Sequence, residues 1–211
     1  MTAGSSTFVK ICGITRLIDA RAAVRAGANA IGFVFAPSPR RISPLKAADI
    51  AARVHPCILK FGVFVGASAA SIARAVDSVG LDGVQLHGNA EPLAELRVSH
   101  PNLLISKVLK PSEKIEDLEP PTDLVFVDPK DPADPSATSR PIALKRLMSA
   151  DLPNMVVAGG LTPRNVGKVV ELVTPYGVDV SGGVEESPGK KDPALVRAFV
   201  ESVRRAEARV A

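Results

Sequence analysis

The chain has 211 residues, of which 46% are hydrophobic and 23% are charged, and it carries a formal net charge of +4 with only two cysteines. This composition is that of an ordinary globular protein, and it argues against a disulfide framework and against a membrane span of about 20 apolar residues. The basic residues form no long run and tryptophan is absent, so we expect no nucleic-acid or membrane partner. No signal peptide is apparent, and we expect a reducing, cytoplasmic compartment.

Short apolar runs alternate with helical stretches along the chain. Eight such runs are rich in Val, Ile, Leu and Phe, and most lack strict alternation of apolar and polar residues. This pattern is typical of strands that are buried on both faces. The runs cover residues 8–14, 30–35, 59–65, 83–88, 103–109, 124–128, 154–160 and 177–183.

Several of the helical stretches have recognisable ends. Residues 17–28 place apolar side chains on one stripe, and Gly27 is predicted to end that helix. The helices after the fourth, fifth and sixth runs are less clearly marked. Three other helices are each predicted to begin with a capping side chain followed by proline, at Ser43–Pro44, Thr162–Pro163 and Asp192–Pro193.

Strands that alternate with helices predict an α/β fold with a parallel sheet. Eight such units in just over 200 residues match a (β/α)₈ barrel, the TIM barrel, near its lower size limit. We therefore predict one domain over residues 1–211, with eight parallel strands and outer helices. A doubly wound open sheet is the alternative.

In a parallel barrel, the active site lies at the carboxyl ends of the strands. Polar groups at those ends are therefore candidates for function, whereas Cys57 precedes the third strand and is expected to be structural. The candidates are Cys12, Gln85, His87, Asp128, Gly159–Gly160, Asp179 and Ser181.

Two glycine pairs predict an anion site. One pair follows the seventh strand and the other follows the eighth, and the loops after these two strands commonly bind phosphate in barrels. Glycine lets backbone N–H groups approach an anion, although tight turns also use glycine. The joint position of Gly159–Gly160 and Gly182–Gly183 favours a phosphate site.

Cys12 and Asp128 follow the first and sixth strands, roughly opposite each other in a ring of eight. A thiol whose pKa is lowered can act as a general base, and a carboxyl whose pKa is raised can act as a general acid. The competing interpretations are a buried structural cysteine and a loop-capping aspartate.

Two further candidates follow the second and fourth strands. One arginine of the Arg40–Arg41 pair is a candidate to clamp a carboxylate, with a solvated loop charge as the alternative for the other. His87 ends the fourth strand, where it either contacts substrate or supports the site.

Taken in order, these segments resemble the phosphoribosylanthranilate isomerase family of tryptophan biosynthesis. The resemblance runs from about Lys10 to Phe199, nearly the whole chain. The matching segments are KICGIT (10–15), GFVFAPSPRRISP (32–44), GVFV (62–65), VQLHG (84–88), VFVD (125–128), AGGLTPRNV (158–166) and GVDVSGGVEESPGKKD (177–192).

The resemblance implies a reaction and a set of site residues. The reaction is the Amadori rearrangement of N-(5-phosphoribosyl)anthranilate to 1-(2-carboxyphenylamino)-1-deoxyribulose 5-phosphate, an internal redox isomerisation that needs no metal or organic cofactor. Cys12 would be the general base, Asp128 the general acid, and Arg40 the group that holds the anthranilate carboxylate. The expected partner is this small phosphorylated substrate, and a monomer and a homodimer both stay open. His87 and Asp179 would line the substrate pocket, and phosphate would be bound by Gly159, Gly160, Ser181, Gly182 and Gly183.

Two segments depart from the family pattern. Residues 134–145 contain no glycine where the family usually has a glycine-rich sixth loop, which predicts a stiffer loop. Residues 181–185 read SGGVE in place of the more usual SSGVE, which removes a hydroxyl but keeps the backbone donors.

Two other functions are alternatives to this one. An aminoaldose isomerase of histidine synthesis is expected to use two aspartates where Cys12 and Asp128 stand, although acceptance of both substrates stays open. A non-catalytic phosphate-binding barrel is disfavoured because both residues are intact.

Overall fold

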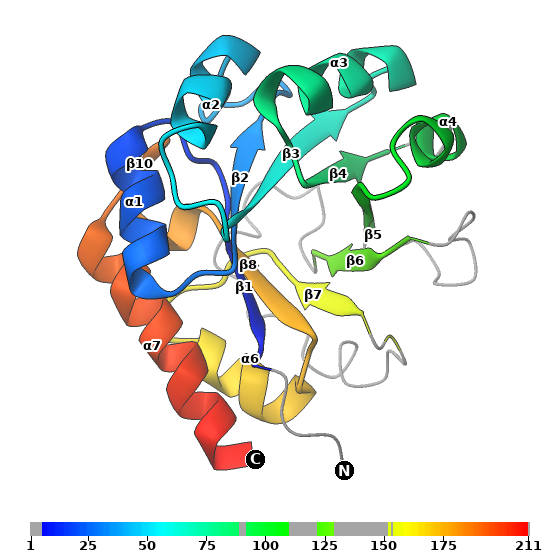
Figure 1. Cartoon of the computed structure of the whole chain (residues 1–211). Coiled ribbons are helices and arrows are strands. Elements are labelled where there is room, and N and C mark those ends of the chain that lie inside the picture. The colour runs from blue at the N-terminus through cyan, green and yellow to red at the C-terminus, as the bar shows by residue number, and fades with distance from the viewer. Residues whose placement is uncertain (1–5, 89–91, 110–121, 129–151, 153, 211) are drawn as a thin grey trace.

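Eight parallel strands form a closed barrel, in which each strand pairs with the next and β8 pairs with β1 (Figure 1). The computed structural model describes residues 6–88, 92–109, 122–128, 152 and 154–210. The predicted TIM barrel is therefore confirmed, and the open-sheet alternative is wrong. The strands are β1 (Phe8–Ile11), β2 (Ala30–Val34), β3 (Leu59–Val65), β4 (Gly83–His87), β5 (Leu104–Leu109), β6 (Leu124–Val127), β7 (Met155–Val157) and β8 (Gly177–Val180).

Helices surround the barrel on its outside (Figure 1). After β8 the chain forms a 3₁₀ helix, η3 (Gly182–Val184), and a hairpin of β9 (Glu185–Ser187) and β10 (Lys190–Lys191). The segment predicted to be a helix after the fifth strand and the glycine-free sixth loop lie outside the described residues. The described helices are α1 (Leu17–Ala26), α2 (Pro44–Ala51), α3 (Ala69–Val79), α4 (Pro92–Ser99), α6 (Val166–Val173) and α7 (Pro193–Val210).

Three of the predicted helix ends are confirmed. The Ser43 side chain accepts a hydrogen bond from the backbone of Lys46 at the start of α2, and Asp192 accepts one from Ala194 at 2.7 Å at the start of α7. Gly27 ends α1 with a φ of +86°, a left-handed conformation that favours glycine.

The predicted start of α6 is wrong. This helix begins at Val166 after Asn165, and not at Thr162 and Pro163. The Thr162 N–H donates to Asn165 Oδ1 at 2.7 Å, and Asn165 Nδ2 donates to the carbonyl of Gly160 at 3.0 Å. These two bonds fold the segment into a turn that belongs to the loop after β7, so the loop is longer than the capping pattern suggests.

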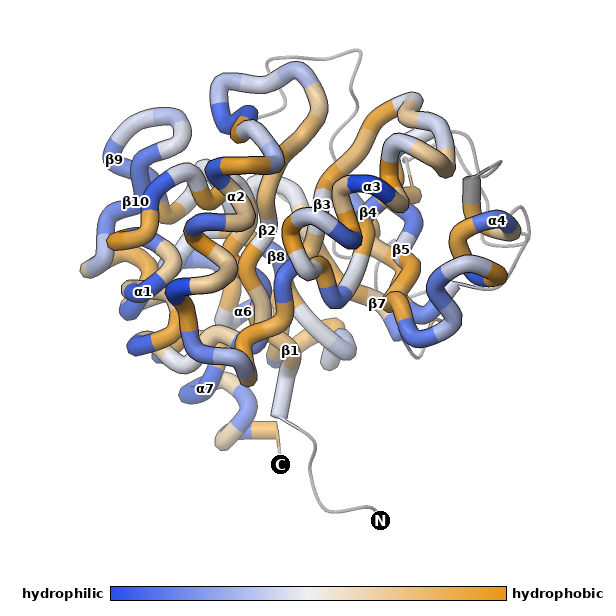
Figure 2. The backbone as a smooth tube through the Cα atoms, turned by 45° about the horizontal axis from the view of Figure 1, so that its top comes forward, coloured by the Kyte–Doolittle hydropathy of each residue, from blue (hydrophilic) through white to orange (hydrophobic). Residues whose placement is uncertain are grey.

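Alternate side chains of each strand face the interior of the barrel or the helices. Outward residues such as Val9 and Ile11 are fully buried against the helix layer. Figure 2 shows that apolar residues are concentrated along the strands. Apolar side chains from several of the strand segments form a cluster inside the barrel, consisting of Phe8, Ala30, Phe61, Val108, Leu124, Phe126, Val156 and Ala158.

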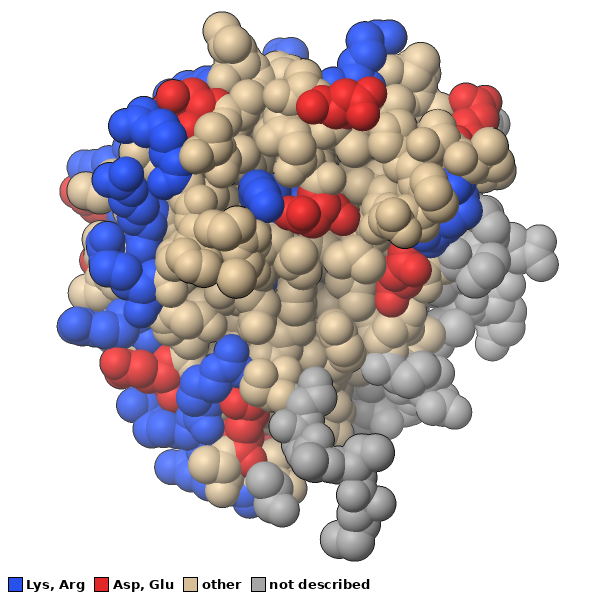
Figure 3. Space-filling view, in the orientation of Figure 1, with Lys and Arg blue, Asp and Glu red and all other residues tan. Residues whose placement is uncertain are grey.

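The charged side chains lie mainly on the outer helices. In Figure 3, Lys and Arg gather over α1 and α7 with acidic residues among them. On α7, Glu201 lies 3.9 Å from Arg197 and 3.8 Å from Arg205, and Arg209 pairs with Glu171 of α6 at 2.8 Å. In the described part of the chain, no helix has both the length and the hydropathy to cross a bilayer.

Candidate active site at the mouth of the barrel

The carboxyl ends of the strands surround a pocket of about 560 Å³. Every site residue predicted from the sequence lines this one pocket, although the residues come from segments far apart in the chain. These residues are Cys12, Arg40, Gln85, His87, Asp128, Gly159, Gly160, Asp179, Ser181, Gly182 and Gly183.

Cys12 follows β1 and lies at the floor of the pocket. Its N–H donates to the carbonyl of Val180 at 2.8 Å, which continues the ladder between β1 and β8. A Cβ atom on Gly32 of β2 would lie 2.8 Å from the Cys12 sulphur, so the space for the thiol depends on that glycine. Burial raises the pKa of the Cys12 thiol above its ordinary value.

Asp128 follows β6 on another side of the mouth. Its backbone N–H donates to the carbonyl of Leu109 at 3.4 Å. A Cβ atom on Gly159 would lie 1.9 Å from Asp128 Oδ1, so the carboxyl group packs directly against the backbone of that glycine. The position of Asp128 is therefore coupled to the loop that follows β7.

The loops after β7 and β8 lie against each other. Gly159 and Gly160 have φ values of +74° and +69°, which favour glycine. A Cβ atom on Gly183 would lie only 1.8 Å from the carbonyl oxygen of Leu161, so only glycine allows the two loops this contact. Backbone N–H groups of both loops are thereby brought to one edge of the pocket, which suits an anion.

Arg40 is held in place by a carboxylate from the hairpin after β8. Its Nε and Nη2 atoms donate to the two oxygens of Glu185 at 2.8 and 2.7 Å. Lys191 Nζ and the Gly189 N–H also donate to this carboxylate, at 2.8 and 3.1 Å. The two bonds from Arg40 fix the plane of its guanidinium at the rim of the pocket beside Gly182. A guanidinium has five N–H donors, so three are not used by Glu185.

The same contacts lower the pKa of Glu185 to about 2. Burial alone would raise it, but the hydrogen bonds and charges of Arg40 and Lys191 outweigh burial. The Glu185 side chain is 4% exposed, so solvent screens these contacts little.

We expect the lowered pKa of Glu185 to make stability depend on pH. Its carboxylate stabilises the fold above an unfolded-state pKa of about 4.5, and that stability is lost as pH falls toward 2. In urea unfolding, the free-energy difference between wild type and Glu185→Gln should shrink by roughly 2 kcal/mol from pH 7 to pH 3. The matched control is Glu186→Gln, since that neighbour is 60% exposed. A difference that is the same at both pH values contradicts the prediction.

A buried polar cluster lies inside the barrel below the pocket. Lys10 is fully buried, and its ammonium donates to Gln85 Oε1 at 2.9 Å and to Asp179 Oδ1 at 3.0 Å. It also lies 5.1 Å from the centre of the Phe126 ring. Asp179 therefore contributes to the pocket and to this cluster.

Sequence reasoning missed Lys10, Glu185 and Lys191. A signal for Lys10 was present, because it lies between Phe8 and Cys12 at the two-residue spacing of inward side chains. No such periodicity marks Glu185 or Lys191, which lie in a hairpin where the predicted strands had ended.

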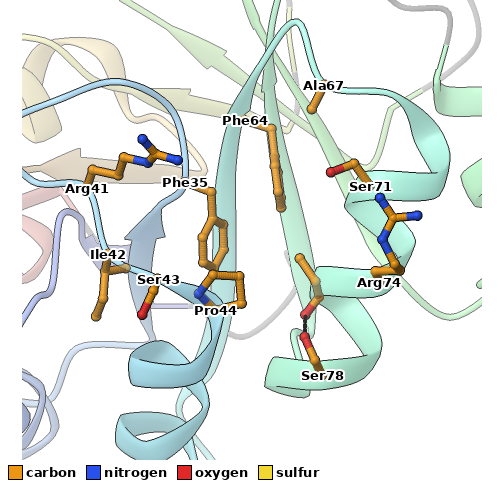
Figure 4. A pocket seen from close by; sticks show the side chains of 11 residues that line it. Phe35, Arg41, Ile42, Ser43, Pro44, Phe64, Ala67, Ser71, Arg74 and Ser78 are labelled. Carbon is orange, nitrogen blue, oxygen red and sulfur yellow. Dashed lines mark hydrogen bonds between the residues drawn. The ribbon is translucent and has the colours of Figure 1, made fainter.

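A second hollow of about 550 Å³ lies outside the barrel between α2 and α3 (Figure 4). Arg41, Arg74, Phe35 and Phe64 are among its lining residues, and none of the predicted site residues lines it. The two adjacent arginines thus have different surroundings, with Arg40 at the mouth and Arg41 at this outer hollow. Among the described residues, no group of three His, Cys, Asp or Glu side chains is placed to hold a metal ion.

Comparison with known proteins decides the family. The family model described as N-(5'phosphoribosyl)anthranilate (PRA) isomerase matches residues 9–202. The chain belongs to this family. It is therefore an enzyme, an isomerase of tryptophan biosynthesis.

Individual relatives support the assignment. The N-(5'-phosphoribosyl)anthranilate isomerase of Pseudomonas fluorescens (strain Pf0-1) is 41% identical over 199 residues, which cover 92% of this chain and 97% of the relative. The crystal structure of the isomerase from Thermotoga maritima has a TM-score of 0.83 and 33% identity, and the match covers 94% of this chain and 99% of that one. Another structure, with a TM-score of 0.76, 34% identity and the same coverage, contains reduced 1-(o-carboxyphenylamino)-1-deoxyribulose 5-phosphate.

Proposed function

We propose that this isomerase converts N-(5-phosphoribosyl)anthranilate to 1-(2-carboxyphenylamino)-1-deoxyribulose 5-phosphate, with Cys12 as general base and Asp128 as general acid. The observation that carries the proposal is the composition of one pocket. A thiol, a carboxyl group, an arginine and two glycine loops all line the mouth of the barrel. These groups match the proton transfers of the reaction and the two anionic ends of the substrate.

Asp128 acts first, on the furanose ring. Its carboxyl group donates a proton to the ring oxygen, and the C1–O bond breaks as the lone pair of the aniline nitrogen forms a C=N bond. The product is an open-chain Schiff base with a protonated nitrogen. Asp128 packs against the backbone of Gly159, which supports this role, because a phosphate bound at that loop would orient the ring toward the carboxyl group.

Cys12 acts second, on the carbon next to the iminium. Its thiolate removes the C2 proton, and the electrons of that bond form a C1=C2 bond while nitrogen regains its lone pair. The resulting enolamine tautomerises to the ketone when C1 gains a proton and the C2 hydroxyl loses one. A thiolate is required for this step, so burial, which raises the pKa of Cys12, has to be countered by nearby positive charge.

The two ends of the substrate are held by different groups. The phosphate lies against Gly159–Gly160 and Ser181–Gly183, where the two glycine loops meet and backbone N–H groups are available to an anion. The anthranilate carboxylate binds Arg40, whose orientation is fixed by Glu185. Bound at both ends, the ribose lies between Cys12 and Asp128, with His87 and Asp179 lining the same pocket.

The experiment follows the fluorescence of the anthranilate substrate. Purified chain should consume phosphoribosylanthranilate with no added metal, at the same rate with and without EDTA. Cys57→Ser is a suitable control, because Cys57 is an exposed free thiol and should leave the rate unchanged. No consumption of substrate, or loss of activity in EDTA, would contradict the proposal.

We also infer a reducing, cytoplasmic location for this enzyme. Both cysteines of the chain are free, one buried in the pocket and one exposed. The proposed base has to remain a reduced thiol to work, and a reducing compartment maintains it in that form.

A further inference from the structure

The Lys10 ammonium is buried in the barrel without direct access to solvent. Its contacts are Gln85 on β4, Asp179 on β8 and the ring of Phe126 on β6. Barrel interiors are usually filled by branched apolar side chains. A buried ion pair of this kind often stabilises a fold no more than apolar residues of the same volume. Stability alone therefore does not account for a lysine at this position.

Lys10 lies in β1 and Cys12 directly follows that strand, two residues later, so both side chains face the interior of the barrel. A Cβ atom placed on Gly32 would lie 2.8 Å from the Cys12 sulphur and 3.2 Å from Lys10 Cε. The thiol and the end of the lysine side chain thus border the same small space. Because Gly32 has no side chain, no Cβ atom of that residue separates the Cys12 thiol from the end of the Lys10 side chain.

We propose that Lys10 is a positioning residue whose buried ammonium favours the thiolate form of Cys12. The proposal rests on the proposed function, in which that thiolate removes the C2 proton. Asp179 and Gln85 fix the ammonium below the sulphur through hydrogen bonds of 3.0 and 2.9 Å. In a poorly solvated interior, a fixed positive charge stabilises an anion far more than it does in water.

The direction of the pKa shifts agrees with this arrangement. Burial raises the pKa of Cys12, and among the opposing influences the charge of Lys10 is the largest. Burial likewise lowers the pKa of Lys10, but Asp179 and Cys12 more than offset it, so Lys10 stays protonated.

Other charged or titratable groups also face Cys12. Lys191 acts in the same direction as Lys10, and Asp179 acts in the opposite direction. Both lysines are paired with a carboxylate, and of the two Lys10 has the larger effect on the thiol. The remaining groups that line the pocket are Arg40, His87 and Asp128.

The test measures how fast Cys12 reacts with iodoacetamide as a function of pH, in a Cys57→Ser background that leaves one thiol. Removal of the ammonium in Lys10→Met should move the midpoint of reactivity upward by about one pH unit or more, with roughly tenfold slower alkylation below the midpoint. The limb of the kcat/KM profile that reports the base should move by the same amount.

Lys60→Met is the matched control. Lys60 is also a partly buried strand lysine paired with a carboxylate, 2.7 Å from Asp82, but it lies near the amino end of β3. Its removal changes the net charge equally and should move the midpoint by less than about 0.3 pH unit.

Lys10→Met leaves the Asp179 carboxylate without its ammonium and could disturb the fold. A second variant separates such a disturbance from the electrostatic effect. Asp179→Asn removes the negative charge instead, and it should move the alkylation midpoint downward. Loss of structure alone would move both variants in the same direction. The reagent reacts in the absence of substrate, so a binding role of Asp179 does not enter the result.

Opposite shifts of the two variants support the proposal. An unchanged midpoint in folded Lys10→Met, or shifts of the same sign in both variants, overturns it. Failure of the proposed function would be seen separately, as full turnover by Cys12→Ser, because the alkylation experiment does not depend on catalysis.

Discussion

The Cys12→Ser and Asp128→Asn variants are each expected to lose about 1,000-fold or more in kcat while they remain folded. A serine hydroxyl ionises far above the working pH, so Cys12→Ser keeps the size of the side chain but loses the base. An asparagine amide has no proton to donate to the ring oxygen, so Asp128→Asn keeps the shape and loses the acid. Both are measured with the fluorescence assay under saturating substrate, and folding is checked by urea unfolding.

Two matched variants test whether the loss is specific to the mouth of the barrel. Cys57→Ser changes the other cysteine, which is exposed. Asp123→Asn changes an aspartate at the opposite end of β6, where it pairs with Arg97 at 2.7 Å. Both controls should keep kcat within about twofold of wild type, because neither residue lines the pocket. Near-wild-type turnover by Cys12→Ser or Asp128→Asn would show that the acid–base pair is assigned wrongly.

Much of the fold was predictable because both faces of each strand are buried. Such strands appear in the sequence as continuous apolar runs, and all eight runs contain a strand of the barrel. Closure of the ring was harder to predict from the sequence. It depends on pairing of Phe8 with Gly177 and of Ile11 with Val180, at opposite ends of the chain. Only the number of units indicated it.

The candidate site was predictable for a related reason. In a parallel barrel, the carboxyl ends of all strands meet at one rim, so a residue that follows a strand is placed without knowledge of its contacts. This rule brought Cys12, Asp128 and both glycine pairs to the same pocket. Their presence together is observed, and their individual roles are proposals.

The residues that the sequence did not indicate act through distant partners. Lys10 contacts Gln85 and Asp179, which lie 75 and 169 positions away, and Arg40 contacts Glu185, 145 positions away. No local pattern encodes such pairs, because each depends on the closed ring. The start of α6 differs for a local reason, since the Thr162 carbonyl accepts from the N–H groups of Asn165 and Val166 in a turn, and the regular helix begins only at Val166.

The second large effect is expected at the contact between the two glycine loops. Gly183→Ala should raise KM about 100-fold, with a smaller change in kcat. The added Cβ would lie 1.8 Å from the carbonyl oxygen of Leu161, which is backbone and cannot rotate away, so the two loops have to separate. Hydrogen bonds from backbone N–H groups to a phosphate contribute about 1.5–3 kcal/mol each, so misalignment of one or two of them accounts for this loss of affinity.

Gly182→Ala is the matched control, one residue earlier in the same loop. The nearest atom to its Cβ would be Arg40 Nη2 at 3.3 Å, a contact that a small shift relieves without separation of the two loops. Its KM should therefore rise by no more than about threefold. Inorganic phosphate used as a competitive inhibitor supplies a second readout, because its inhibition constant should weaken in Gly183→Ala and stay close to wild type in Gly182→Ala. Equal effects of the two variants would mean that the contact at Leu161 does not set the geometry of the anion site, and that the phosphate binds elsewhere in the pocket.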